Sequence, residues 1–338
     1  MACATPLILI ISTDMASGLE ITGLRIGLSS LDGEAFPVDG VDLAVPAGGS
    51  LALVGESGCG KSVTAAAILR LTQSPLRLAG GSIRWDGRDL AALPADGREL
   101  RSVRFREIAM IFQEPMQSLS PVHTIGDQIR EVLRIHLGVR GAAADARAAE
   151  ALDLVGIPDP RGCLRRYAFE LSGGQRQRAM IAMALACRPR LLIADEPTTA
   201  LDVTIQAQIL DLLARLRREL GLAMLLITHD LGVVAEAAER IAVMYRGRVV
   251  EYGPTGEVLA APGHPYTAAL LRSIPGLAVA PGGELATIPG SVPPPFARLD
   301  GCPFAPRCAL AVPGRCTAGI APAMKRVGGR GHACPEVH

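Results

Sequence analysis

A phosphate-binding loop lies near the start of the chain. Residues 55–62 read GESGCGKS and match the pattern G-x-x-x-x-G-K-[ST]. The apolar residues 51–54 suit a buried strand before this loop, and the alanine-rich residues 63–71 suit a helix after it. In such a loop the backbone N–H groups wrap phosphates, Lys61 reaches the β and γ phosphates, and the Ser62 hydroxyl meets Mg²⁺. The residues predicted to bind the nucleotide here are Gly55, Glu56, Ser57, Gly58, Cys59, Gly60, Lys61, Ser62 and Val63.

A second phosphate-directed motif, LSGGQRQR, occupies residues 171–178. Ser172, followed three residues later by Gln175, predicts a capping box at the start of a helix. Capping alone does not need two glycines. Gly173 and Gly174 leave the backbone N–H groups at the positive end of the helix dipole open to an anion. On its own the motif is typical of a glycine-tolerant helix start, but together with the loop upstream it predicts a second contact with phosphate.

Two carboxylates follow the buried-strand pattern of residues 191–194. A metal-bound triphosphate needs one acidic group to hold Mg²⁺, directly or through water. It needs a second acidic group to orient or deprotonate the attacking water. Asp195 and Glu196 fit these two roles in that order.

A histidine follows another apolar run. Residues 223–227 predict a strand that delivers Thr228, His229 and Asp230 at its carboxyl end, where open α/β sheets place their ligands. A single histidine after a strand is more often a structural residue than a catalytic one. The three other phosphate-directed motifs reverse that expectation, so His229 is a candidate site residue.

The remaining elements predict an α/β fold with a helical insertion. Apolar residues recur at helical spacing over residues 125–137, the alanine-rich residues 142–155 end at a glycine, and residues 207–220 form a further amphipathic helix. Residues 275–295 are rich in Pro and Gly, which indicates a linker. The first two of these helical stretches, which lie between Gln113 and Leu171, suggest a helical subdomain that presents the LSGGQRQR motif.

Composition narrows the classes of function. The 338 residues are 49% hydrophobic, which is enough for a full α/β domain and a smaller one. The net charge of +1 gives no electrostatic footprint for nucleic acid. The mean hydropathy of +0.31 is high, yet no run reaches the roughly 20 apolar residues that span a bilayer. Any association with a membrane is therefore expected to come through partner proteins.

The motifs together resemble those of a known family. From about Leu19 to the C-terminus the chain resembles the ATP-binding subunits of ABC transporters. The resemblance rests on GESGCGKS, LSGGQRQR, the histidine of ITHD, FQEPMQSLSP at 112–121, LLIADEP at 191–197 and TALD at 199–202. Three of the segments are similar to the oligopeptide and dipeptide import branch, namely FQEPMQSLSP, HPYTAALLRSIP at 264–275 and GCPFAPRC at 301–308.

The resemblance implies a role for each site residue. Gln113 corresponds to a glutamine that senses Mg²⁺ and the γ-phosphate, Glu196 to the catalytic carboxylate, and His229 to a histidine that contacts the γ-phosphate. Asp202 corresponds to an aspartate at a dimer interface. Ser172, Gly173, Gly174 and Gln175 then bind the ATP that a partner subunit holds. The implied Mg²⁺ ligands are Ser62, Gln113 and Asp195.

The resemblance also implies the domains and the partners. We expect an N-terminal tail over residues 1–18, of which the first 14 are either an over-extended reading frame or a disordered tail. An ABC nucleotide-binding domain is expected over 19–274, with its helical subdomain at about 114–170, and a linker with a C-terminal cysteine module over 275–338. The implied fold is a P-loop α/β domain with a mixed core sheet. The implied partners are a second ABC ATPase, two transmembrane permease subunits and an extracytoplasmic substrate-binding protein, with this chain peripheral on the cytoplasmic face of the inner membrane.

Several alternatives stay open at this point. The same ATPase could serve an importer of nickel or another small solute, because nothing in the chain reads the substrate. DNA-repair and translation ATPases share the nucleotide motifs, but the chain lacks their long heptads, inserted zinc modules and second cassette. Intact Glu196 and His229 argue against a non-enzymatic regulatory binder. The adenine-stacking position aligns with Leu28 rather than an aromatic residue, and Phe36 is the nearest ring.

Four cysteines fall close together near the C-terminus. Cys302, Cys308, Cys316 and Cys334 follow the spacing C-x5-C-x7-C-x17-C. Disulfides are rare in cytosolic ATPases, and a short Pro-rich module without a clear core needs a staple, which indicates a metal. Zinc prefers tighter cysteine pairs, whereas iron–sulfur clusters tolerate varied loops. The pattern resembles that of peptide-importer ATPases with a 4Fe-4S cluster, so this cofactor is predicted over zinc or four free thiols.

Overall fold

The computed structural model describes residues 17–31, 33–113, 118–199, 201–274, 287–327 and 329–337. The chain divides into two compact units. The first comprises residues 1–46, 50–92 and 228–338, and the second comprises residues 47–49 and 93–227. Most of the predicted N-terminal tail and the start of the predicted linker lie outside the described residues. The domain boundaries proposed from the sequence therefore stay predictions.

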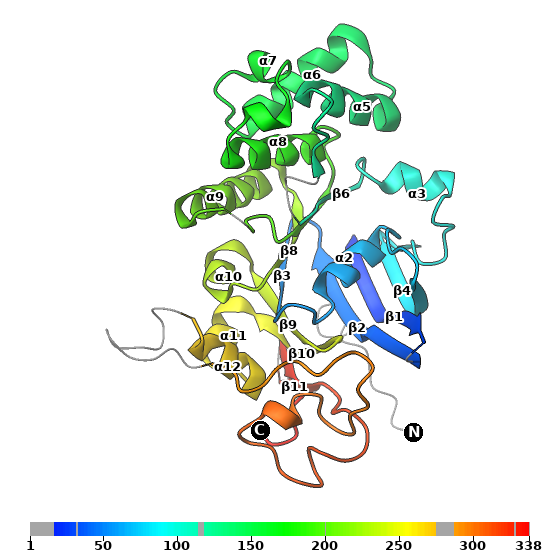
Figure 1. Ribbon diagram of the computed structural model, residues 1–338, viewed down its shortest axis with the longest axis vertical. Helices are drawn as coiled ribbons and strands as arrows, with labels where there is room; N and C mark the ends of the chain where they lie inside the picture. Colours follow the sequence, from blue (N-terminus) through cyan, green and yellow to red (C-terminus); the bar gives the residue numbers. More distant parts are fainter. Residues whose placement is uncertain are drawn as a thin grey trace. The chain divides into compact units, whose positions relative to one another are not determined.

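An antiparallel sheet opens the first unit (Figure 1). Its strand order is β2-β1-β4-β5. Alternate apolar residues of β1, among them Leu19 and Ile21, are fully buried, as expected for a sheet with one face on the core. Helix α2 (Lys61–Ile68) contacts β1 and β2. The strands are β1 (Gly18–Ser30), β2 (Gly33–Pro46), β4 (Leu76–Trp85) and β5 (Arg88–Asp89).

A second group of strands in the same unit follows the order β11-β12-β10-β9-β3. Strand β3 (Ser50–Val54) is buried throughout and pairs in parallel with β9 (Arg240–Tyr245). The other neighbours pair antiparallel. These are β10 (Arg248–Pro254), β11 (Lys325–Val327) and β12 (Arg330–His332), accompanied by helices α10 (Leu231–Ala237), α11 (Thr255–Ala260) and α12 (Pro265–Arg272). The strand predicted before the phosphate-binding loop is confirmed.

The C-terminal cysteine segment shares the core of the first unit. Cys302, Phe304 and Cys316 pack in one apolar cluster with Val54 of β3 and Tyr266 of α12. A short 3-10 turn, η2 (Ala305–Arg307), lies within this segment. The expectation of a module without a clear core was therefore wrong, because the segment buries its apolar side chains against β3, β9 and the neighbouring helices. This removes one physical reason for requiring a metal staple.

The second unit contains a parallel group of strands. Strand β7 (Leu191–Asp195) lies between β6 (Ile108–Ile111) and β8 (Ala223–Thr228), and both pairings are parallel. Every residue of β7 is buried, which matches its unbroken apolar sequence. Helix α9 (Val203–Leu220) ends at Gly221, whose φ of 63° is the left-handed conformation common after a helix. The strands predicted over 191–194 and 223–227 are confirmed.

Helices make up the rest of the second unit, and α5, α6 and α7 gather beside α8 (Figure 1). Thr124 and Asp127 form a capping box at the start of α5, and Gly138 ends it in the left-handed conformation. These helices are α3 (Arg98–Val103), α5 (Ile125–Leu137), α6 (Gly141–Leu154), α7 (Pro160–Cys163), the 3-10 turn η1 (Ala168–Glu170) and α8 (Gly173–Leu185). Among the described helices, none is long and apolar enough to cross a membrane.

A buried histidine begins α12 in the first unit. The Nδ1 atom of His264 accepts a hydrogen bond from the backbone N–H of Tyr266 at 3.1 Å. The backbone N–H of His264 donates to Oε2 of Glu251 at 2.9 Å. Burial, with a smaller contribution from His332, lowers the pKa of His264 to about 3. The neutral imidazole is therefore part of the folded state.

Acid should destabilise the protein through this histidine. The unfolded chain takes up a proton at this position below about pH 6.5, whereas the folded chain does not until about pH 3, so the free energy of unfolding falls as pH decreases between these values. His264→Asn keeps a capping oxygen without titrating, so its urea unfolding should depend less on pH between about pH 7 and pH 5. Substitution of the exposed His123 by Asn is the control. Equal pH dependence in the parental protein and His264→Asn would contradict this assignment.

Candidate functional site

The phosphate-binding loop packs its backbone directly against neighbouring strands. Gly55, Gly58 and Gly60 have φ values of 155°, 78° and 102°, which residues other than glycine rarely adopt. A Cβ at Gly55 would collide with the carbonyl oxygen of Met244 in β9, and one at Gly60 would collide with that of Pro37 in β2. Two of the glycines are thus required by close approach as well as by conformation. The loop follows β3 and leads into α2 at Lys61, as the sequence predicts.

Lys61 lies inside the loop. Its Nζ donates to the carbonyl oxygens of Gly55 at 2.7 Å and Glu56 at 3.0 Å, and it lies 3.8 Å from Sγ of Cys59. The Lys61 residue is 4% exposed. Burial raises the pKa of the Cys59 thiol, although the Lys61 charge opposes this shift. The exposed loop residues are Ser57 and Gly58, whereas the predicted Mg²⁺ ligand Ser62 and its neighbour Val63 are half-buried.

A cavity adjoins the outer side of this loop. It has a volume of about 520 Å³, and Ser57, Gly58 and Phe36 line it together with residues 292–299. The guanidinium carbon of Arg25 lies 4.3 Å from the centre of the Phe36 ring. Leu28 is not among the described residues that line this cavity. Of the two positions left open for adenine stacking, Phe36 is the one beside the loop.

His229 lies in the first unit, directly after β8, and its side chain is exposed. The adjoining residues fix the backbone at this point. Thr228 Oγ1 accepts a hydrogen bond from the backbone N–H of Asp230 at 3.0 Å. The Asp230 carboxylate in turn accepts from the backbone N–H of Gly232 at 2.9 Å and caps α10.

Two of the three predicted catalytic residues, Gln113 and Glu196, belong to the second unit and contact each other. Gln113 Nε2 donates to Oε2 of Glu196 at 3.0 Å. Thr199 Oγ1 donates to the same oxygen at 3.0 Å. Glu196 has a φ of 46°, a left-handed conformation that is costly for a residue with a side chain. Asp195, the preceding residue, is 3% exposed at the end of β7. The strand end thus places a buried and a half-buried carboxylate in succession.

The LSGGQRQR motif begins α8 with the predicted capping box. The backbone N–H of Gln175 donates to Oγ of Ser172 at 3.3 Å, and the backbone N–H of Ser172 donates to Oε1 of Gln175 at 3.1 Å. Gly174 also has a packing reason, because a Cβ there would lie 3.0 Å from Ile205 of α9. Asp202 caps α9 by accepting a hydrogen bond from the backbone N–H of Ile205 at 2.9 Å. The capping prediction is confirmed.

The four C-terminal cysteines line one small cavity, together with His264 and Glu336. All four have free thiols. Burial raises the pKa of Cys302 and Cys308, and the neighbouring Cys334 raises both further. Within the described ranges, no three Cys, His, Asp or Glu side chains lie so that they could hold a metal ion. The predicted 4Fe-4S or zinc site therefore has the right donors in one place, but the structure does not support a formed metal centre.

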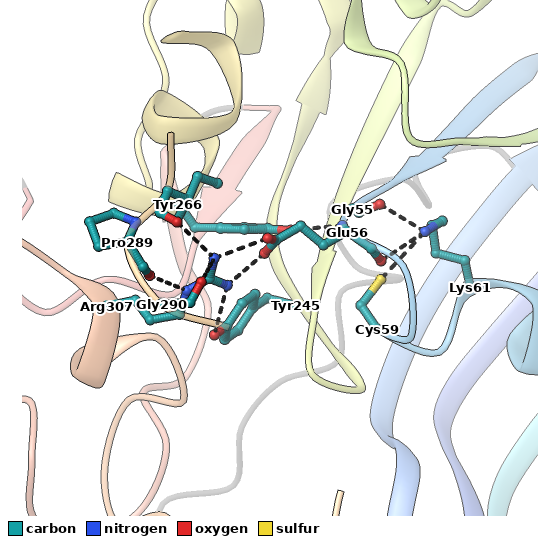
Figure 2. Close-up of polar contacts among 10 residues, drawn as sticks. Gly55, Glu56, Cys59, Lys61, Tyr245, Tyr266, Pro289, Gly290 and Arg307 are labelled. Atoms are coloured by element: carbon teal, nitrogen blue, oxygen red, sulfur yellow. Dashed lines mark hydrogen bonds and ion pairs between the residues drawn. The ribbon is translucent and has the colours of Figure 1, made fainter. Parts of the chain in front are cut away.

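Sequence reasoning missed two residues that contact the phosphate-binding loop (Figure 2). Arg307 pairs with the Glu56 carboxylate at 2.7 Å, and the Tyr266 hydroxyl accepts a hydrogen bond from the Glu56 backbone N–H at 2.9 Å. Both lie in segments, GCPFAPRC and HPYTAALLRSIP, that were used only as marks of a family. Each segment does contain a polar side chain among apolar neighbours, which is a sign that the side chain is buried with a partner. The sequence alone could not show that this partner is Glu56.

Comparison with known proteins identifies the family. Residues 38–199 match the model of the ABC transporter family, and residues 250–316 match that of the oligopeptide/dipeptide transporter C-terminal region. A protein of Brucella melitensis with the provisional name peptide import ATP-binding protein is 53% identical over 315 residues, which cover 90% of this chain and 92% of that protein. The chain belongs to the ABC transporter ATP-binding proteins. As such, it is an ATPase.

Other proteins similar to this ABC ATPase support the same family assignment. A Brucella abortus protein with the same provisional name is 49% identical over 325 residues, which cover 96% of each chain. Among solved structures, the bacterial ABC transporter cassette MJ0796, described as dimeric, is 27% identical with a TM-score of 0.62 and covers 70% of this chain and 98% of that one. The cassette cbiO1 of Clostridium perfringens has a TM-score of 0.61 at 26% identity, over 72% of this chain and 91% of that one. The predicted family and fold class are confirmed.

Proposed function

We propose that this ABC ATPase powers the import of dipeptides or oligopeptides across the cytoplasmic membrane. The observation that carries this proposal is the match of residues 250–316 to the C-terminal region of oligopeptide/dipeptide transporters. The names of both Brucella relatives refer to peptide import. The same C-terminal region supplies Tyr266 and Arg307, which contact the phosphate-binding loop.

The oxygen donors of the site suit MgATP. The loop over residues 55–63 wraps the phosphates with its backbone N–H groups, and Lys61 exchanges its carbonyl contacts for the terminal phosphates. Ser62, Gln113 and Asp195 offer hydroxyl, amide and carboxylate oxygens, the donor types that Mg²⁺ prefers. When bound, Mg²⁺ neutralises charge on the phosphates. Phe36, beside the loop, is the ring on which adenine stacks.

Glu196 orients the water that attacks the γ-phosphate. Its carboxylate is held by hydrogen bonds from Gln113 and Thr199, both to Oε2. The left-handed backbone at Glu196 is strained, and such strain is common where a catalytic side chain must be aimed. His229 contacts the γ-phosphate. A carboxylate fixed in this way aligns water without reorganising during the reaction.

A composite site requires a second ATPase. We propose that residues 172–175 bind the ATP held by a partner subunit, because α8 begins there with its N–H groups at the positive end of the helix. Asp202 lies at the same interface. The complete importer contains two transmembrane permease subunits and an extracytoplasmic substrate-binding protein, and this chain is peripheral on the cytoplasmic face of the membrane. The solved cassette MJ0796 is a dimer, which is consistent with this arrangement.

A metal cofactor at the C-terminal cysteines remains part of the proposal. Its support is that Cys302, Cys308, Cys316 and Cys334 line one cavity with free thiols. The positions of the described side chains do not yet form a metal site, so assembly requires the thiols to deprotonate and draw together. A 4Fe-4S cluster is the first candidate, and zinc is the alternative.

Glu196→Gln should abolish turnover while leaving ATP binding intact. The amide keeps the shape of the side chain but no longer orients or deprotonates the water, so the transporter should accumulate in the ATP-bound closed dimer. Lys61→Ala should instead weaken binding of ATP itself. We would measure steady-state ATPase activity and bound nucleotide in the assembled transporter. Parental turnover in Glu196→Gln would show that another residue is the catalytic carboxylate.

The isolated complex should contain a second, different ATPase chain. This follows from the likeness to the peptide-import branch and not from any defect in this chain, since both halves of its composite site are intact. Co-expression with the neighbouring genes, followed by mass measurement of the purified complex, would reveal the composition. A stable complex with two copies of this chain and no other ATPase would refute the heteromeric arrangement.

Protein purified without oxygen should contain iron and labile sulfide if the cysteines bind a cluster. The solution should then absorb broadly near about 400 nm, as thiolate-bound iron does. Cys308→Ser should lose the iron, whereas substitution of Cys187, a buried cysteine of the second unit, by Ser should retain it. One zinc ion per chain, without iron, would instead support the zinc alternative. Absence of iron, sulfide and zinc would leave four free thiols.

A further inference from the structure

Arg307 reaches the phosphate-binding loop from the far end of the chain. Its Nη1 donates to Oε2 of Glu56 at 2.7 Å, and its Nη2 donates to Oε1 at 3.0 Å (Figure 2). The Arg307 side chain is 4% exposed and that of Glu56 is 28% exposed. A paired contact of this kind fixes the orientation of the carboxylate as well as its distance. The second residue of the loop is thus held by the C-terminal segment.

The guanidinium is itself held in place. Its Nε donates to the carbonyl oxygen of Pro289 at 2.8 Å, and Nη2 also lies 3.4 Å from the carbonyl oxygen of Gly290. Hydrogen bonding to the Glu56 carboxylate raises the pKa of Arg307, so the cation is permanent. The Tyr245 hydroxyl lies 3.5 Å from Nη1. Arg307 is therefore a fixed positive charge and not a mobile surface side chain.

The backbone of Glu56 is held from the same side. Its N–H donates to the hydroxyl of Tyr266 at 2.9 Å, and its carbonyl oxygen accepts from Lys61 at 3.0 Å. The Tyr266 ring packs against Tyr245 and Phe304, with ring centres 4.6 Å and 5.3 Å away. Burial raises the pKa of Tyr266, so its phenol stays neutral. Side chain and backbone of Glu56 are thus both anchored in the core of the first unit.

A carboxylate in a phosphate-binding loop presents an electrostatic problem. Glu56 lies immediately before the N–H groups that receive the phosphates, and like charges at this range repel in a partly buried site. Arg307 supplies the opposite charge and places it on the side away from Lys61, as the view of their contacts shows (Figure 2). The negative charge of Glu56 is then already paired before a polyphosphate approaches the loop.

We infer that Arg307 is a positioning residue of the ATP site, which sets nucleotide affinity by neutralising and orienting Glu56. It touches no nucleotide and acts through Glu56 alone. This inference rests on the proposed binding of MgATP by the loop. It predicts that loss of the Arg307 charge weakens nucleotide binding and leaves the catalytic step unchanged, since Gln113 and Glu196 keep their contacts.

The test uses full-length protein in the assembled transporter. Arg307→Gln should raise the Kd and KM for MgATP about tenfold while kcat changes less than about twofold, because one uncompensated charge acts on binding rather than on the transition state. Raising the ionic strength should bring the Kd of Arg307→Gln closer to the parental Kd, since salt screens the exposed side of the Glu56 charge. The double variant Glu56→Gln with Arg307→Gln should return the Kd to within about threefold of the parental value, because neither charge remains.

Arg315→Gln is the matched control. Arg315 belongs to the same segment and also pairs with a glutamate, Glu336, at 3.2 Å, but it does not contact the loop. Its substitution should leave the Kd at the parental value. Thermal unfolding of each variant separates weakened binding from loss of fold. If Arg307→Gln does not fold, Arg307→Lys replaces it, with a rise in Kd of about threefold expected from a retained charge without the paired contact.

Three results would overturn the inference. One is a parental Kd in the folded Arg307 variants. Another is a double variant that binds as weakly as Arg307→Gln, because the charge on Glu56 would then not be the cause. Failure of the parental protein to bind MgATP would refute the proposed function of the loop and not the role of Arg307 in holding it. A fall in kcat with unchanged KM would also overturn the inference, because Arg307 would then act on the catalytic step and not on binding.

Discussion

The close backbone approach between the phosphate-binding loop and β9 is the constraint on which the first unit depends. Gly55 leaves no room for a side chain because the carbonyl oxygen of Met244 occupies that space. The loop is therefore a packed edge of the strands and not a free connection. Any element that fixes β9 also fixes the loop, and β9 pairs with β10, which pairs in turn with the C-terminal strand β12. Hydrogen bonds between these strands connect the C-terminal region to the strand against which the phosphate-binding loop packs.

This arrangement explains why the cysteine segment is not an independent module. Phe304 lies in one aromatic group with Tyr245 of β9 and Tyr266 of α12, and Cys302 and Cys316 pack beside it. A segment of about 40 residues rarely supplies a sufficient core by itself. Here the core of the first unit supplies it. Phe304 of this aromatic group lines the cysteine cavity, and Tyr266 of the same group accepts a hydrogen bond from the phosphate-binding loop.

Local sequence patterns predicted the helices and strands that contain the nucleotide motifs. They did not predict the contacts between residues far apart in the chain. Strand β7 and the capping box of α8 follow from apolar runs and from the spacing of Ser172 and Gln175. The contact of Gln113 with Glu196 joins residues 83 apart, and only the family resemblance brought them into one site. The pair of Arg307 with Glu56 spans 251 residues and has no periodicity that a single sequence could reveal. The cysteine spacing indicated proximity but could not show whether the thiols form a metal site.

The choice of basic residue around the loop follows from geometry. The chain has only two lysines, Lys61 and Lys325, and the compact ammonium of Lys61 donates to two carbonyl oxygens inside the phosphate-binding loop. At position 307 the requirement is different, because the cation must face two carboxylate oxygens and a carbonyl oxygen at once. A planar guanidinium meets these acceptors with separate N–H groups, whereas an ammonium offers a single point charge. The loop thus lies between a lysine held by two of its own carbonyl oxygens and an arginine that cannot leave Glu56 without a buried charge losing its partner.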